Sequence, residues 1–172
     1  MSDSNPPDVH CTHVPHRYDA VFFDLFGTLI DETATAVSGA LERLEECRGA
    51  PWAIVTSTDA RLALRLIARA RLPNPPLLVT ADDVARNKPA PDGYLYAAAR
   101  LGVLPCRSVV LEDTAGGIAA ARSAGMDVVA VLGGRPAELA IGATFVVADL
   151  MTLRLRRSEG AVYLTLEERE RR

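Results

Sequence analysis

Short apolar runs alternate with amphipathic stretches along most of this chain, beginning near Tyr18. Continuous apolar runs are typical of strands buried on both faces, and apolar residues at three- and four-residue spacing are typical of helices packed on a sheet. The runs predict six strands, at residues 20–25, 52–56, 77–80, 108–112, 127–131 and 144–147. The amphipathic stretches predict four helices between them, at residues 37–48, 60–71, 92–101 and 116–124.

This order of elements predicts an α/β fold, a Rossmann-like three-layer α/β/α domain with a mostly parallel sheet. A chain of 172 residues fits one domain that buries a core without disulfides or structural metal. We place the domain at residues 18–166, with a further strand at residues 161–166. A flexible N-terminal arm is expected at residues 1–17 and a charged C-terminal tail at residues 167–172.

Composition and charge favour small-molecule chemistry. The formal net charge is −3, which gives no electrostatic reason to expect nucleic-acid binding. Cys11, Cys47 and Cys106 form neither a disulfide framework nor a paired metal site. No apolar run approaches the roughly 20 residues that span a bilayer, and the first residues lack the apolar region of a signal peptide. A cytoplasmic protein that binds neither membranes nor nucleic acid is therefore expected.

Three further patterns are assigned no chemistry. The Gly-Gly-Arg-Pro sequence at residues 133–136 resembles a phosphate-binding loop, but it lacks the Walker spacing and lysine, and a turn before a helix explains it. The basic run at residues 154–157 is short and lies near acidic residues, so a solvated face is predicted. No standard zinc spacing is matched by the N-terminal cluster of His10, Cys11, His13 and His16.

Ligands of a parallel sheet bind beyond the carboxyl ends of its strands, where the loops converge. Polar side chains follow most of the predicted strands, and a lysine lies in the loop before the third helix: Asp24, Thr56, Ser57, Thr80, Lys88, Glu112 and Asp113. Asp24 ends an apolar strand and is followed by Gly27, which allows a tight turn. An unpaired buried carboxylate is costly, so Asp24 either caps the turn or acts as a nucleophile that forms an aspartyl-phosphate.

Four motifs in order resemble those of the haloacid dehalogenase-like (HAD) superfamily. Residues 22–29 resemble the first motif, Asp-x-Asp-Gly-Thr after an apolar strand, and residues 53–57 the second, a strand that ends in a hydroxyl. Residues 87–92 resemble the third, which contains a lysine, and residues 109–118 the fourth, with paired carboxylates. Residues 80–102 are similar to the branch that contains β-phosphoglucomutase and small sugar-phosphate phosphatases.

The resemblance implies a Mg²⁺-dependent phosphomonoesterase. It makes Asp24 the nucleophile, with Thr56 and Lys88 as the other catalytic residues. It implies that the phosphoryl group is bound by Gly27, Thr56, Ser57 and Lys88. The implied metal ligands are Asp24, the carbonyl of Phe26 and Asp113, with Glu112 orienting a metal-bound water.

Phe26 departs from the phosphatases of this superfamily. They place a second aspartate there, which protonates the leaving alcohol and then activates water. A positioned general acid or base contributes about 10²–10⁴-fold, so weak activity on alkyl phosphates is expected. In having an aromatic residue at this position, the sequence resembles the haloacid dehalogenases, whose departing halide needs no proton. A metal-independent 2-haloacid dehalogenase is therefore one alternative, although Glu112 and Asp113 resemble the metal-binding motif of the phosphatases.

The second departure is the missing cap domain. Relatives in this branch insert a helical cap after the first motif, but only residues 31–36 separate Ile30 from the helix predicted to begin at Val37. A cap closes over small substrates and excludes water, so its absence predicts an open site. An open site suits a phosphorylated small molecule or macromolecule, with a second copy or another partner as a lid. It also suits a second alternative, a catalytically impaired protein that binds a phosphate group or a partner.

Overall fold

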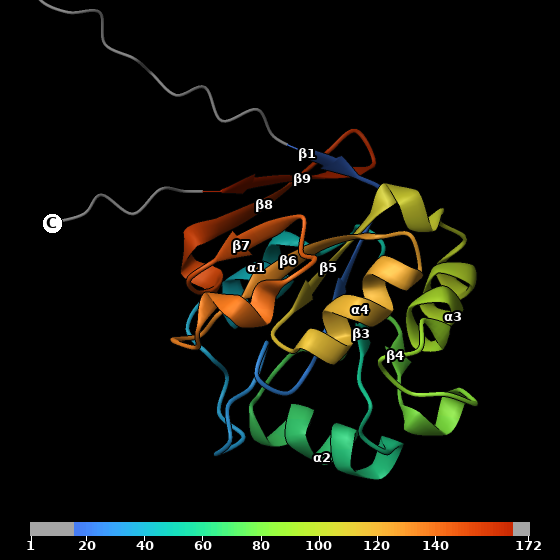
Figure 1. Ribbon diagram of the computed structural model, residues 1–172, viewed down its shortest axis with the longest axis vertical. Helices are drawn as coiled ribbons and strands as arrows, with labels where there is room; N and C mark the ends of the chain where they lie inside the picture. The colour runs from blue at the N-terminus through green and yellow to red at the C-terminus, as the bar shows by residue number, and fades with distance from the viewer. Residues whose placement is uncertain (1–15, 167–172) are drawn as a thin grey trace, which may run out of the picture.

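The computed structural model describes residues 16–166, which form a six-stranded parallel sheet and a three-stranded antiparallel sheet (Figure 1). The parallel sheet has the order β4-β3-β2-β5-β6-β7, which places β2 and β5 at its centre. Its strands are β2 (Ala20–Phe23), β3 (Trp52–Val55), β4 (Leu78–Val79), β5 (Ser108–Glu112), β6 (Asp127–Val131) and β7 (Phe145–Val147). All six strands predicted from the sequence are confirmed, and every neighbouring pair is parallel.

Helices cover both faces of this sheet, which confirms the three-layer α/β/α fold. Helices α1 (Ala40–Glu46) and α2 (Ala60–Arg69) contribute Leu44 and Ile67 to one buried cluster. Helices α3 (Asp92–Leu101) and α4 (Ala115–Ser123) lie together over the other face (Figure 1) and contribute Tyr94 and Ile118 to the second cluster. Short 3₁₀ helices complete the chain: η1 (Ala81–Asp83), η2 (Pro105–Arg107), η3 (Ala137–Ala140) and η4 (Leu150–Thr152).

Helix α1 begins three residues later than the apolar pattern predicted, at Ala40 rather than Val37. The residue before it, Gly39, has a left-handed backbone with φ of 88°. A β-carbon on Gly39 would lie 2.9 Å from the Leu150 side chain. The glycine therefore serves a close approach between the start of α1 and η4, which no local periodicity reports.

The antiparallel sheet consists of β1 (His16–Tyr18), β8 (Leu153–Ser158) and β9 (Ala161–Leu166), in the order β1-β9-β8. Of these strands the sequence predicted only β9. The prediction of a solvated face at residues 154–157 is wrong for Leu155, because β8 alternates and buries this side chain against the α1 face of the core. Arg156 and Arg157 are exposed as expected.

The predicted arm and tail fall largely outside the described residues. His16 and Arg17 were assigned to the flexible arm but lie in β1, where they pair with Leu164 and Tyr163 of β9. The pairing joins the two ends of the described chain, so a local pattern could not reveal it. The histidine and cysteine cluster, except His16, and the charged tail at residues 167–172 lie outside the described residues.

The link between β2 and α1 confirms that no cap domain is inserted there. The Asp31 carboxylate accepts hydrogen bonds from the backbone amides of Thr33 and Thr35, both at 2.9 Å. An antiparallel bridge between Ile30 and Ala36 closes the turn. Within residues 16–166, no helix is both long and apolar enough to cross a membrane.

Candidate active site

Three carboxylates meet at the carboxyl ends of the two central strands. Asp24 follows β2, Glu112 ends β5 and Asp113 follows it. The parallel register pairs Phe23 with Leu111, and the Asp24 amide donates to the Leu111 carbonyl at 3.0 Å. One oxygen from each carboxylate lies within 4.8 Å of the others, and all three residues are buried. Hard oxygen ligands at this spacing suit a divalent cation such as Mg²⁺.

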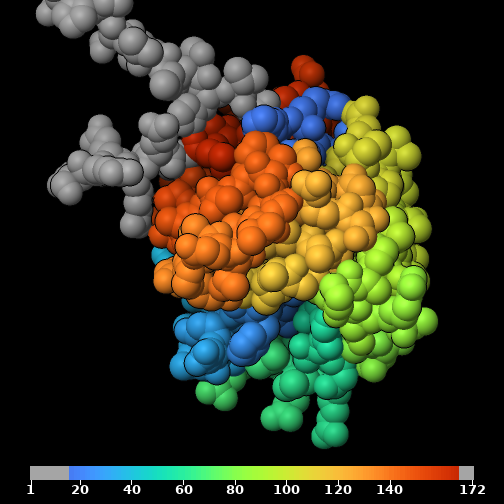
Figure 2. Space-filling model, viewed as in Figure 1, coloured from blue at the N-terminus to red at the C-terminus, as the bar shows by residue number. Residues whose placement is uncertain are grey.

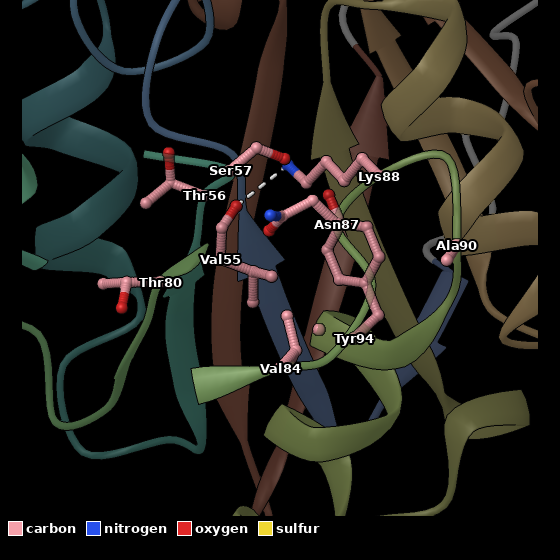
Figure 3. A pocket seen from close by; sticks show the side chains of 10 residues that line it. Val55, Thr56, Ser57, Thr80, Val84, Asn87, Lys88, Ala90 and Tyr94 are labelled. Carbon is pink, nitrogen blue, oxygen red and sulfur yellow. Dashed lines mark hydrogen bonds between the residues drawn. The ribbon is translucent and has the colours of Figure 1, made fainter. Parts of the chain in front are cut away.

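Lys88 brings a positive charge to two of these carboxylates from the loop that precedes α3. Its Nζ donates to Asp24 Oδ1 at 2.5 Å, to Glu112 Oε1 at 2.7 Å and to the Val55 carbonyl at 2.9 Å. Figure 3 shows the side chain extended toward the end of β3. The ammonium group also lies 5.0 Å from the centre of the Tyr94 ring, a favourable cation–π distance.

Glu112 has both carboxylate oxygens bonded within the protein. Oε2 accepts from the Asp113 amide at 2.9 Å and from the amide and hydroxyl of Thr114, both at 3.0 Å. Oε1 accepts from Lys88 and from the Tyr94 hydroxyl at 3.1 Å. In this arrangement Glu112 holds Lys88 and the start of α4 in place.

Asp113 is engaged from two further loops. Its Oδ1 accepts from the buried Thr28 hydroxyl at 3.1 Å, and its Oδ2 forms an ion pair with Nη1 of Arg135. A β-carbon on Gly27 would lie 2.1 Å from Asp113 Oδ2, so the turn after β2 packs directly on this carboxylate. Gly27 also has φ of 87°, which favours glycine. The absence of a side chain on Gly27 thus allows the turn after β2 to pack against the Asp113 carboxylate.

Burial and neighbouring charges shift the pKa values of these groups. Burial raises the pKa of Asp24 to about 7, although the Lys88 charge opposes this shift. Burial alone would lower the pKa of Lys88, but the charges of Asp24 and Glu112 raise it above its usual value. Burial likewise acts to raise the pKa of Glu112, but Lys88 and the hydrogen bonds from Thr114 and Asp113 hold it below its usual value. Without metal, the structure therefore favours charged Lys88 and Glu112 beside an Asp24 that titrates near neutral pH.

The two hydroxyl residues after β3 lie differently. Thr56 is buried, and its hydroxyl accepts from the Thr58 amide at 3.2 Å, which stabilises the turn into α2. Ser57 is exposed, and in Figure 3 the side chains of Ser57 and Lys88 point toward each other, whereas that of Thr56 points away from Lys88. Both residues line the same small cavity as Lys88. In this structure Ser57 is the hydroxyl turned toward Lys88.

Comparisons with known proteins agree with this geometry. A family model described as haloacid dehalogenase-like hydrolase matches residues 32–125, more than half of the chain. The match includes Thr56, Lys88, Glu112 and Asp113 and begins after Asp24. The chain belongs to the haloacid dehalogenase-like hydrolase family.

Relatives of this HAD chain include named phosphatases. Hexitol phosphatase A of Escherichia coli (strain K12) is 43% identical over 58% of this chain and 47% of its own length. Validoxylamine A 7'-phosphate phosphatase of Streptomyces hygroscopicus subsp. limoneus is 36% identical over 70% of this chain and 58% of its own length. This chain thus spans about half the length of these curated relatives, and the predicted resemblance to the sugar-phosphate phosphatase branch is confirmed.

A solved structure supports the same assignment. The HAD family hydrolase of Deinococcus radiodurans R1, crystallised with bound phosphate and sodium, is 36% identical. It superimposes with a TM-score of 0.62 over 68% of this chain and 56% of that chain. The two chains therefore share a HAD fold over this part of their lengths.

Phe26 stands out in this HAD sequence because the residue is 46% exposed although it lies two positions after the buried Asp24. The apolar phenylalanine side chain offers no proton donor or acceptor, unlike an aspartate at this position. Phe26, which departs from the sequence pattern of the phosphatases, is thus accessible to solvent.

Thr28, Tyr94 and Arg135 are among the residues of the HAD site that were not predicted. Thr28 belongs to the first motif, and this position could have identified it as a site residue. Tyr94 lies on the buried face of α3, where the sequence pattern indicates only a residue of the hydrophobic core. Arg135 lies in the glycine-containing loop to which the sequence assigned no chemistry. All three donate to Glu112 or Asp113.

Proposed function

We propose that this HAD chain is a Mg²⁺-dependent phosphomonoesterase that forms an aspartyl-phosphate on Asp24. The observation that carries the proposal is the contact of Lys88 with both Asp24 and Glu112, next to Asp113. This arrangement offers a carboxylate nucleophile, a fixed positive charge and oxygen ligands within one buried cluster. Phosphoryl transfer needs these components, because catalysis consists mainly of positioning and charge stabilisation.

The residues fit a Mg²⁺ ion. Asp24, Asp113 and the Phe26 carbonyl would hold it, and the absence of a side chain on Gly27 lets the turn that carries Phe26 approach Asp113. When bound, the ion would offset charge on the phosphoryl oxygens and on the carboxylates. Glu112, already bonded by five donors, supports the site by holding Lys88 and the first residues of α4.

The proposed reaction has two displacements at phosphorus. The ionised Asp24 carboxylate forms a bond to phosphorus as the bond to the leaving oxygen breaks, and Lys88 and Ser57 contact the phosphoryl oxygens. Water then attacks the phosphorus of the aspartyl-phosphate, the bond from phosphorus to the Asp24 oxygen breaks, and inorganic phosphate is released while one proton of the water passes to solvent. With Phe26 in place of the acid/base aspartate, the leaving oxygen departs without a proton from that position. Weakly basic leaving groups are therefore favoured.

The relatives support a phosphorylated sugar or sugar alcohol as substrate class, since two of them are named for such phosphatase activities. The related Deinococcus radiodurans structure contains bound phosphate and sodium, which supports a protein of this family that binds an anion and a cation. The turn at residues 31–36 leaves the site without an inserted cap. A bulkier phosphorylated substrate therefore remains compatible with the proposal.

Turnover of an aryl phosphate tests the proposal. Hydrolysis should require Mg²⁺, stop with EDTA and fall at least about 10³-fold in Asp24→Asn, which removes the nucleophile. Asp19→Asn is the matched control, because Asp19 immediately precedes β2 at the opposite end of the strand, and its activity should be unchanged. Turnover without metal would contradict the proposal, and metal-free halide release from a 2-haloacid would favour the dehalogenase alternative.

The variant Phe26→Asp tests the account of weak activity. If only the acid/base is missing, its rate on an alkyl phosphate should rise by about 10²-fold or more, with a smaller gain on the aryl phosphate. Equal rates for the variant and the natural protein would show that another part of the site limits turnover. Binding of phosphate and Mg²⁺ without any turnover, in both proteins, would favour the non-catalytic alternative.

A further inference from the structure

Arg135 reaches the site from the loop that follows β6. Gly133 and Gly134 have φ of 57° and 85°, backbone conformations that residues with side chains rarely adopt. The resulting turn directs the Arg135 guanidinium to Asp113. In the space-filling view, the orange segment beyond β6 lies beside the blue segment that follows β2 (Figure 2). Two loops that are distant in sequence therefore meet at this carboxylate.

The guanidinium is fixed from three directions. Nε donates to the Leu132 carbonyl at 2.9 Å, Nη2 donates to the Val131 carbonyl at 3.1 Å, and Nη1 pairs with Asp113. The backbone carbonyls at the end of β6 hold the planar group with Nη1 directed at Asp113. A fork fixed in this way loses little further freedom when it forms an ion pair. Since the Arg135 side chain is only 34% exposed, solvent screens the pair incompletely.

Asp113 consequently has two competing uses. Its Oδ2 neutralises Arg135, while its carboxylate also belongs to the group of three that fits a divalent cation. A guanidinium and a metal ion that share one carboxylate repel each other, and each needs the negative charge that the other takes. A metal ion that binds here must displace Nη1 from Asp113 or share the carboxylate with it.

We infer that Arg135 is an internal competitor of the metal ion. It neutralises Asp113 when no ion is bound, and it lowers the affinity of the site for Mg²⁺. The inference rests on the proposed metal site, and it assigns a role to the Gly-Gly-Arg-Pro loop. The positive charge that keeps Asp113 stable in its buried position also sets the Mg²⁺ concentration at which the site fills.

Calorimetric titration with Mg²⁺, without substrate, tests the inference. Arg135→Gln should bind Mg²⁺ at least about fivefold more tightly than the natural protein, because a nearby positive charge and its ion pair are removed. Arg122→Gln is the matched control. Arg122 donates to a backbone carbonyl, that of Gly142, but lies near the far end of α4, about 10 Å along the helix from its first residue, Ala115. Its affinity should be unchanged.

Because the inference predicts a gain in affinity, a variant that misfolds cannot imitate the expected result. In the natural protein, the NMR signal of the Arg135 Nε–H should also shift during the titration, with the same midpoint as the calorimetric curve. Equal or weaker Mg²⁺ binding by Arg135→Gln, with binding intact in the natural protein, would overturn the inference and leave the proposed function standing. Absence of Mg²⁺ binding in every variant would overturn the metal site and the inference together.

Discussion

At the scale of single residues, the buried charges of the site make its protonation depend on pH near neutrality. Asp24 is 7% exposed, and the negative charge of its buried carboxylate is compensated by the ion pair with Lys88. Burial raises its pKa from 3.8 to about 7. In the metal-free protein the Asp24 carboxyl group therefore titrates close to neutral pH, and a bound cation would favour its ionised form.

This pKa predicts a change of stability with pH. Between pH 3.8 and about pH 7, the folded protein binds more protons at Asp24 than the unfolded chain does. The stability that Asp24 contributes is thus present below pH 3.8 and lost as the pH rises to about 7. We expect the free energy of unfolding of the natural protein to fall over this range relative to that of Asp24→Asn, measured by urea unfolding in EDTA. A constant difference would show that Asp24 ionises normally.

Individual residues also show what the sequence could and could not reveal of the site. Asp24, Glu112 and Asp113 lie at or just after strand ends and Lys88 precedes a helix, all within recognisable motifs, and the structure brings them together. Arg135 carries no such signal, because its contact with Asp113 depends on a turn made by two glycines and on the neighbouring positions of β5 and β6. Which of the two hydroxyl groups, that of Thr56 or that of Ser57, faces Lys88 depends on side-chain direction, which the sequence does not specify.

At the scale of secondary-structure elements, the start of α4 is shaped around Glu112. Thr114 caps the helix by accepting from the Gly117 amide, and the same hydroxyl donates to Glu112. A β-carbon on Gly117 would lie 1.7 Å from Glu112 Oε1, whereas one on Gly116 would meet no atom within 4 Å. Two adjacent glycines in one helix therefore have different reasons to be glycine.

The two glycines give a matched pair of variants. Gly117→Ala should lower the free energy of unfolding by about 1–3 kcal/mol, because the methyl group displaces the Glu112 carboxylate. It should also reduce Mg²⁺-dependent turnover, since Glu112 holds Lys88. Gly116→Ala should raise stability by about 0.5–1 kcal/mol, because alanine favours the helix. Urea unfolding measures both values, and equal effects of the two changes would contradict this assignment.

At the scale of the whole molecule, the antiparallel sheet ties the ends of the described chain to the HAD core. The connection runs through the buried Arg43 of α1, whose Nη1 donates to the carbonyls of Leu150 and Leu153. Arg43 also pairs with Glu46, and Glu46 in turn accepts from the Leu155 amide at 2.8 Å. The six parallel strands were predictable because each has its own apolar run, but this connection depends on partners from opposite parts of the chain.

Loss of this connection should destabilise the molecule. Arg43→Ala should lower the free energy of unfolding by about 3 kcal/mol, because it leaves buried carbonyls without a donor and opens a cavity. Arg48→Ala is the control, since Arg48 is 77% exposed and pairs with the exposed Glu45. Its effect should be below about 0.5 kcal/mol. Similar unfolding midpoints for the two variants would show that the antiparallel sheet is held in another way.

The central claim is that Asp24 accepts a phosphoryl group in this site. A crystal structure with Mg²⁺ and beryllofluoride, a mimic of the phosphoryl group, tests it most directly. The account predicts a beryllofluoride bonded to an Asp24 oxygen, with the ion held by Asp24 and Asp113 and with Lys88 in contact with the mimic. An ordered Mg²⁺ ion beside an unmodified Asp24 would contradict the claim and leave a site that binds without forming a phosphoenzyme.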